Sequence, residues 1–402
     1  MTGRRVWIVM LGLALLAGFA VPIAWTAVSA VRSADTSATA ADGRPSADAT
    51  PTEGNAANGT AAASGAGSAG TAAPAEQPSE AAPPPGPTGP VTLAFGGDVH
   101  FESYLGDAVR ADPQGALSPV GDLFAKADVA VVNLETAVTD RGAAAPKQYN
   151  FRAPRKGLTA LQAAGVDVVS LANNHGMDFG YQGLRDTLRA ARRADLPLVG
   201  AGHSAKQAYR PHEMTVNGRR VAILGATQVL DTFAIEAWTA RGNRAGLASA
   251  KEDHGGLRRL LRAVRQADER VDTVVVVLHW GLEGASCPLP RQEELAEQLA
   301  DAGADIVVGG HAHRLQAGGF LGDTVVHYGL GNFVFYTDGG PGADSGVFSV
   351  TIARDDAVRT TWRPAVLQSG VATRLTGDSA AAARRSWRDL RSCTNLTAKP
   401  TR

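Results

Sequence analysis

From Val91 onward, short apolar runs alternate with segments whose apolar residues recur at helical spacing. The runs predict strands, and several, such as 274–277, are apolar at every position, as in strands buried on both faces. The predicted strands are Val91–Phe95, Val129–Val132, Val166–Ser170, Arg220–Leu224, Thr273–Leu278, Asp305–Val308, Val325–Tyr328, Val347–Ala353 and Val358–Trp362. The predicted helices are Arg155–Ala164, Gly180–Ala194, Lys251–Ala267 and Pro290–Ala302. This alternation favours an α/β fold, and the last strands, which have no helices between them, predict an antiparallel part.

The N-terminal pattern is different. Arg4 and Arg5 precede an uncharged, mostly apolar stretch over residues 6–31. The stretch is longer than the about 20 residues that cross a bilayer, so residues 1–31 predict a signal peptide or a membrane anchor. Small residues at 28–30 suit a signal peptidase, whereas the length favours an uncleaved anchor. Because the basic residues keep the N-terminus in the cytoplasm, we expect the rest of the chain outside the cell membrane, held by a single-pass segment or secreted.

Composition divides the remaining chain. Residues 32–90 are rich in Ala, Gly, Pro, Ser and Thr and contain no aromatic residue, so they predict a disordered linker. Residues 91–370 form the predicted globular domain, and residues 371–402 form a C-terminal tail that we expect to pack on it. The formal net charge of the 402 residues is zero, which gives no reason to expect a nucleic-acid partner.

Polar residues gather directly after five of the predicted strands, at their carboxyl ends. They are Asp98 and His100, Asn133 and Glu135, Asn173 to His175, His279, and His311 and His313. In open α/β sheets the ligand site lies beyond the carboxyl ends of the strands, so we expect these side chains to meet there.

The residue types in these clusters indicate a metal site. Imidazole and carboxylate ligands together suit Mn, Fe or Zn better than Ca or Mg. No cysteine takes part, which argues against a structural zinc site. A carboxylate can bridge two ions, as two-metal hydrolases require, so two divalent transition metals are the expected cofactors.

The order of these motifs resembles the calcineurin-like metallophosphoesterase superfamily and, within it, the capsule-synthesis CapA family associated with poly-γ-glutamate. The matching stretches are Gly97-Asp98-Val99, Asn133-Leu134-Glu135, Ser170 to His175 with Asp178 and Gly180, His279-Trp280-Gly281 with Glu283, Gly310 to His313 with Gln316, and Tyr328 to Phe333. The resemblance implies a layered sandwich in which helices flank central mixed β-sheets.

The resemblance also implies roles for single residues. It places Asp98, His100 and His313 on one metal and Asn174, His279 and His311 on the other. Glu135 would bridge the two ions, although the superfamily usually has Asp after Gly at that position. His175 would face the substrate as a general acid or a transition-state stabiliser.

Five further residues have two open interpretations. Asn173 and Asn332 either support the site or only satisfy backbone groups at strand ends. Asp178 either belongs to the site or caps the helix that begins near Gly180. Glu283 and Gln316 contact either the ligand side chains or the substrate.

Two functions fit these observations. The first is a metal-dependent phosphoester hydrolase that acts in cell-envelope or capsule-polymer metabolism. The alternative is a non-hydrolytic accessory subunit for the synthesis, export or anchoring of poly-γ-glutamate or another anionic surface polymer. Expected partners are the cell membrane, polymer-synthesis membrane proteins, and either the anionic polymer or a phosphoester substrate.

The two cysteines also have two interpretations. Cys287 follows the His279-Trp280-Gly281 turn, and Cys393 follows a predicted helix at Ala380–Leu390. They are either unrelated thiols or one disulfide, and export to an oxidising space favours the disulfide. The bridge would hold the C-terminal tail beside the metal site.

Overall fold

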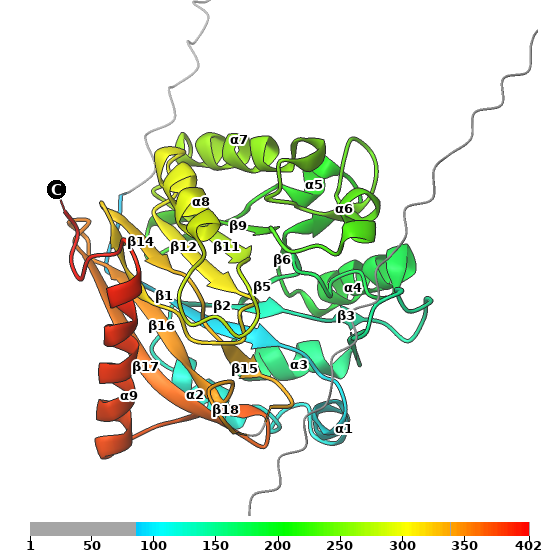
Figure 1. The fold of residues 1–402 in the computed structure, drawn as a ribbon, viewed down its shortest axis with the longest axis horizontal. Helices are drawn as coiled ribbons and strands as arrows, with labels where there is room; N and C mark the ends of the chain where they lie inside the picture. Colours follow the sequence, from blue (N-terminus) through cyan, green and yellow to red (C-terminus); the bar gives the residue numbers. More distant parts are fainter. Residues whose placement is uncertain (1–85, 338, 402) are drawn as a thin grey trace, which may run out of the picture. The chain divides into compact units, whose positions relative to one another are not determined.

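The computed structural model describes residues 86–337 and 339–401. Two β-sheets pack face to face, and helices cover the outer side of each, so the domain has four layers (Figure 1). The predicted class, a mixed α/β fold with central sheets flanked by helices, is confirmed. The predicted membrane segment at residues 1–31 and most of the predicted linker lie outside the described residues.

The first sheet has eight strands in the order β15-β18-β17-β16-β1-β2-β5-β6. They are β1 Val91–Val99, β2 Val129–Leu134, β5 Val168–Ser170, β6 Leu198–Val199, β15 Asn332–Val334, β16 Asp344–Ile352, β17 Val358–Gln368 and β18 Val371–Arg374. Neighbours from β1 to β6 run parallel, whereas β16 to β18 pair antiparallel. The antiparallel part is therefore formed by the last strands of the sheet, as predicted from the absence of helices between them.

The second sheet has six strands in the order β13-β14-β12-β11-β9-β8. They are β8 His212–Val216, β9 Arg219–Thr227, β11 Thr273–His279, β12 Ile306–Gly310, β13 Gly318–Leu321 and β14 Thr324–His327. The central four are parallel, and β8 and β13 add antiparallel edges. Two small pairs, β3 Ala137–Val138 with β4 Arg152–Ala153 and β7 Ala201–Gly202 with β10 Gly246–Leu247, lie outside both sheets.

Strand β1 shows how alternation builds these layers, because successive side chains of a strand point to opposite faces. Val91, Leu93 and Phe95 are buried in the cluster between the two sheets, together with Val275 and Val277 of β11. The intervening Ala94 lies in the cluster beneath the helices of the first sheet. Both faces of β1 are therefore buried, which explains its almost uninterrupted apolar sequence.

The helices follow the same division. They are α1 Tyr104–Ala111, α2 Ser118–Phe124, α3 Lys156–Ala163, α4 Gly180–Ala194, α5 Ala205–Ala208, α6 Thr232–Trp238, α7 Gly256–Asp268, α8 Pro290–Asp301 and α9 Gly377–Asp389, with short 3₁₀ turns at Asp253–Gly255 and Leu390–Cys393. Apolar residues of α1 to α4 pack on the first sheet, and those of α5, α7 and α8 pack on the second. Helix α7 begins five residues after the predicted Lys251, because His254 and Gly255 have φ angles of 53° and 70°, which interrupt a right-handed helix.

None of the helices within residues 86–337 and 339–401 is both long enough and apolar enough to cross a bilayer.

Candidate metal centre

The carboxyl ends of strands from both sheets meet at one place. Strands β1 and β2 of the first sheet bring Asp98 and Glu135, and β11 and β12 of the second bring His279 and His311. The sequence predicted that all these strands end at one edge of a single sheet, whereas in the structure the carboxyl-terminal edges of two sheets meet. Asp98 and Glu135 are fully buried, and His279 and His311 are at most 6% exposed.

Glu135 lies at the centre of the cluster. Its Oε1 is 3.4 Å from His279 Nε2 and 3.9 Å from His313 Nε2. Two groups of side chains offer ligand atoms that all lie within 4.8 Å of one another: Asp98, Glu135 and His279, and Glu135, His311 and His313. Glu135 belongs to both groups, which is the arrangement that a bridging carboxylate requires.

Several buried polar atoms of this cluster have no hydrogen-bond partner. They are both carboxylate oxygens of Glu135 and Nδ1 of His311. A buried carboxylate without partners is costly unless a cation neutralises it. The residues present therefore fit a metal centre, and their nitrogen and oxygen donors suit transition metals.

The shifted pKa values of Asp98 and His313 indicate that these two residues form an ion pair. Burial raises the pKa of Asp98, but the hydrogen bond and charge of His313 oppose this effect and bring the pKa to about 2. Burial lowers the pKa of His313, but the charge of Glu135 and the hydrogen bond to Asp98 raise it to about 9. Without metal, a proton on His313 therefore compensates the buried carboxylates, 3.3 Å from Asp98 Oδ2.

His311 behaves in the opposite way. Its burial, together with the charges of His279 and His313, lowers its pKa well below 6.5. The imidazole is therefore neutral near pH 7, the form that binds a metal. The backbone N–H of His311 donates to Asp98 Oδ2 over 3.0 Å, which fixes the turn against β1.

The turn that carries both histidines has an unusual backbone. The φ angles of His311 and His313 are 89° and 50°, in the region that favours glycine. Such conformations persist where the surroundings enforce them and are frequent at functional sites. Here they direct two side chains separated by one residue toward Glu135.

His100 lies beside the cluster but in neither ligand group. Its Nδ1 accepts a hydrogen bond from the backbone N–H of Glu102 over 3.1 Å. Its ring stacks on Phe151 and contacts Phe335 and Tyr336 edge-on. Burial and the charges of His175 and His313 lower its pKa to about 3. Because the charges of His175, His313 and Asp98 all act on its pKa, His100 lies next to the cluster, and its role as a ligand stays a prediction.

Asn174 and Asn133 fix the orientation of His279. The Asn174 Oδ1 lies 2.7 Å from His279 Nε2, and the Asn133 Nδ2 lies 3.1 Å from His279 Nδ1. Asn133 also donates to Asp98 Oδ1 over 2.8 Å, so it connects ligands of the two sheets. Asn133 was not among the predicted ligands or supporting residues, although its place in the Asn133-Leu134-Glu135 motif was a usable signal.

Two predicted supporting residues make contacts in the centre. Asn173 donates to Asn133 Oδ1 over 3.0 Å and accepts from the backbone N–H of His175 over 3.0 Å. The Asn332 Oδ1 lies 2.9 Å from His313 Nδ1 and so orients that ring.

His175 is part of a buried charged cluster at the edge of the metal centre. Its Nδ1 lies 2.6 Å from Asp178 Oδ2, and its Nε2 lies 3.9 Å from Glu135 Oε1. Phe151 stacks on its ring at a centroid distance of 4.0 Å. Asp178 does not cap helix α4, because Phe179 occupies the N-cap and no side chain caps that end.

Lys147, which was not among the predicted site residues, completes the cluster. Its Nζ lies 2.7 Å from Asp178 Oδ1 and 3.3 Å from His175 Nδ1, and it donates to Asn174 O over 2.5 Å. Its side chain is 10% exposed. Lys147 comes from a loop that no strand-end pattern marks, so only the structure reveals it.

Gln316 and Glu283 differ from each other in environment. Gln316 is fully buried, and its side chain donates to Ala285 O and Cys287 O, so it supports the loop after His279 from below. Glu283 is exposed on that loop, and its charge contributes to the raised pKa of His313.

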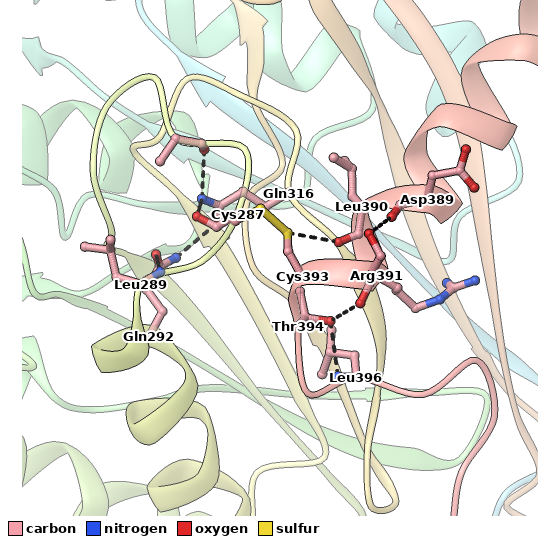
Figure 2. Close-up of a disulfide and its surroundings, with 12 residues drawn as sticks. Cys287, Leu289, Gln292, Gln316, Asp389, Leu390, Arg391, Cys393, Thr394 and Leu396 are labelled. Atoms are coloured by element: carbon pink, nitrogen blue, oxygen red, sulfur yellow. Dashed lines mark hydrogen bonds between the residues drawn. A yellow bond between two sulfur atoms is a disulfide. The ribbon is translucent and has the colours of Figure 1, made fainter.

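The same loop carries the disulfide. Cys287 and Cys393 are bonded across a sequence separation of 106 residues, so the favoured pairing is present (Figure 2). Gln292 Nε2 donates to Gln316 Oε1, and the backbone N–H of Leu289 donates to Gln292 Oε1. The loop is therefore held between helix α8, Gln316 and the C-terminal segment.

The sequence matches the family described as "Bacterial capsule synthesis protein PGA_cap" over residues 92–337. This match includes every residue of the metal centre. The chain belongs to this family.

Curated relatives carry related names. The chain is 40% identical over 199 residues to the "Capsule biosynthesis protein CapA" of Bacillus anthracis, covering 48% of this chain and 45% of that protein. It is 33% identical over 259 residues to the "PGA biosynthesis protein CapA" of Bacillus subtilis, covering 61% and 66%. A "Probable polyglutamine synthesis accessory protein" of Mycobacterium tuberculosis is 34% identical over 221 residues, covering 54% and 58%. The chain thus spans between 45% and 66% of these relatives.

Solved structures are more distant. A putative 5'-nucleotidase from Staphylococcus aureus aligns with 75% of this chain and 58% of its own, at 15% identity and a TM-score of 0.42. That score is too low to support a conclusion about function.

Proposed function

We propose that this member of the capsule-synthesis family is a metal-dependent hydrolase of phosphoester bonds that acts outside the cell membrane in the metabolism of an anionic surface polymer. The observation that carries the proposal is the unpartnered carboxylate of Glu135, buried among Asp98 and three histidines. The family membership and the names of the relatives support an anionic polymer as the target.

The chain's own residues would divide the work. Asp98, Glu135, His279, His311 and His313 would hold two metals of the Mn, Fe or Zn type, with His100 and Asn174 as the remaining predicted ligands. Such ions activate water and stabilise negative charge on a phosphoryl oxygen. Asn133 and Asn332 keep the imidazoles oriented through the contacts described above.

His175 would act on the leaving group of the reaction. Its Nε2 side faces Glu135, while Nδ1 contacts Asp178 and Lys147. The Asp178 carboxylate at Nδ1 holds the ring in the orientation that points Nε2 toward the metal centre. His175 would therefore donate a proton, or a hydrogen bond, to the oxygen that leaves phosphorus.

The alternative proposal is an accessory subunit that binds metal without turnover and works with membrane proteins of polymer synthesis. The relative named an accessory protein favours this alternative.

One experiment separates the two. Metal content and hydrolysis of a panel of phosphodiesters with Mn²⁺ are measured for the full chain, for Glu135→Gln and for Glu269→Gln, which changes an exposed carboxylate remote from the centre. The hydrolase proposal expects turnover that Glu135→Gln loses together with metal, and Glu269→Gln unchanged. Full metal occupancy without turnover on any substrate supports the accessory role instead. Normal metal content in Glu135→Gln contradicts the proposed centre.

A further inference from the structure

A groove that is lined by none of the predicted site residues collects positive charge. It has a volume of about 330 Å³ and lies between helix α7 and the segment that contains α5 (Figure 1). Lys206, Arg210, Arg259, Arg262 and Arg270 line it, and no acidic residue does. Since the whole chain has zero formal net charge, this concentration of cations is a local feature of the fold.

Most of these cations are free to bind an external anion. Arg270 pairs with Glu213 over 2.7 Å, and Arg259 donates to backbone oxygens of the turn before α7. Among the described residues no carboxylate forms an ion pair with Lys206, Arg210 or Arg262, which are all exposed. Closely spaced cations repel one another, and a bound polyanion removes that repulsion.

The walls of the groove discriminate between classes of polyanion. Proteins that bind single-stranded nucleic acid without sequence preference stack bases on exposed aromatic rings. The groove's only aromatic residue, Tyr209, is 7% exposed, so its ring offers no such platform. Helices that lie on membranes insert large apolar side chains, and none of the domain's exposed large hydrophobic residues lines this groove. Guanidinium groups, in contrast, bind carboxylates through two parallel hydrogen bonds.

We propose that this basic groove binds a flexible polycarboxylate chain, of which poly-γ-glutamate is the form that the relatives' names support. The inference rests on the proposed role in anionic-polymer metabolism, and it assigns the polymer a binding surface separate from the metal centre. Arg210, Arg262 and Lys206 are the residues that contact its carboxylates.

The floor of the groove is connected to the metal centre. The Tyr209 hydroxyl accepts from the backbone N–H of Ser249 over 2.9 Å, and Ser249 pairs with Thr227. The Thr227 hydroxyl donates to the backbone oxygen of His279 over 3.3 Å. This chain of contacts therefore connects the residues that line the groove to His279, one of the candidate metal ligands.

Binding is tested with the full chain and labelled poly-γ-glutamate by fluorescence anisotropy at low and at physiological salt. The triple variant Lys206→Gln/Arg210→Gln/Arg262→Gln should bind about tenfold more weakly than the wild type, with a smaller salt dependence. The matched control Arg359→Gln/Arg385→Gln/Arg388→Gln removes the same charge from exposed residues of β17 and α9 and should bind like the wild type. Thermal melting of all three proteins verifies that they are folded.

Three outcomes would contradict the proposal that the groove binds the polymer. They are a wild type that does not bind the polymer, an equal loss in both triple variants, and a wild type that binds anionic-lipid vesicles or single-stranded DNA more tightly than the polymer. Because the measurement is polymer binding, it is separate from hydrolysis. If the chain binds the polymer but cleaves no phosphodiester, only the proposed hydrolase activity is contradicted.

Discussion

At the scale of single residues, the proton on His313 is the simplest property to measure. Its pKa is raised to about 9 from an ordinary value of 6.5. A group whose pKa is raised by folding contributes stability that is complete below 6.5 and is lost as the pH rises through about 9.

For the metal-free chain we therefore expect the free energy of unfolding to fall between pH 6.5 and pH 9, by at most about 3 kcal/mol from this group. Urea denaturation in the presence of a chelator measures it at both pH values. His313→Gln should lose this part of the pH dependence, and His203→Gln, which changes an exposed histidine, should keep it. Equal slopes in wild type and His313→Gln would show that His313 is not the titrating group.

His175 gives a second test, which separates chemistry from metal binding. His175→Ala should keep its metal content and lose about 10²–10⁴-fold in phosphodiester turnover, the usual contribution of a general acid or base. Lys147→Met should also lower turnover, because it leaves Asp178 and His175 without their cation, whereas Lys126→Met changes an exposed lysine outside this cluster. Elemental analysis checks occupancy, and a His175→Ala protein that lacks metal would make His175 a ligand.

The sequence predicted much of this centre because strand ends are marked by patterns. Asp98, Glu135, His279, His311 and His313 each follow a recognisable apolar run, and the fold brings them together. Lys147 lies in a loop with no such run, and its contacts are set by tertiary packing alone. The same holds for the ring of Phe151, which stacks on both His100 and His175.

At the scale of elements, long buried segments were predictable and short ones were not. Each predicted strand overlaps an observed strand, and α4 has the predicted bounds. The edge strand β8 alternates between half-buried and exposed residues and was missed, because its sequence carries no apolar run. Helices α2, α5 and α6 have seven residues or fewer, too few for a clear helical period. Helix α1 was also missed, although α3, which has the same length of eight residues, was predicted.

The disulfide is the element-scale feature with the largest expected effect on stability. Closing a loop of about 100 residues stabilises a protein by up to about 4.7 kcal/mol in the chain-entropy model. We expect Cys287→Ser/Cys393→Ser to lower the free energy of unfolding by about 2–5 kcal/mol. Ser286→Ala/Ser392→Ala changes the neighbouring residues as a control, and denaturation of both proteins without reductant measures the difference. A double cysteine variant as stable as the wild type would show that packing alone holds the C-terminal segment.

At the scale of the whole molecule, the location of the domain is a proposal based on the N-terminal sequence. With the expected orientation, a protease added to intact cells should remove the domain and leave the first 31 residues in the membrane fraction. An epitope after residue 86 and another on a cytoplasmic control protein report the two compartments by immunoblot. A domain that survives while other surface proteins are cleaved contradicts this location.

The position of β1 in its sheet determines how far the chain can be truncated without losing the fold. Strand β1 lies between β2 and β16, and Val91 to Phe95 pair with Phe348 to Ile352, more than 250 positions later. The family match ends at residue 337, before β16 begins at Asp344. The stretch that matches the family is therefore shorter than the unit that folds. A chain ending at residue 337 would expose the hydrogen-bonding edge of β1 and aggregate, although it retains every candidate metal ligand.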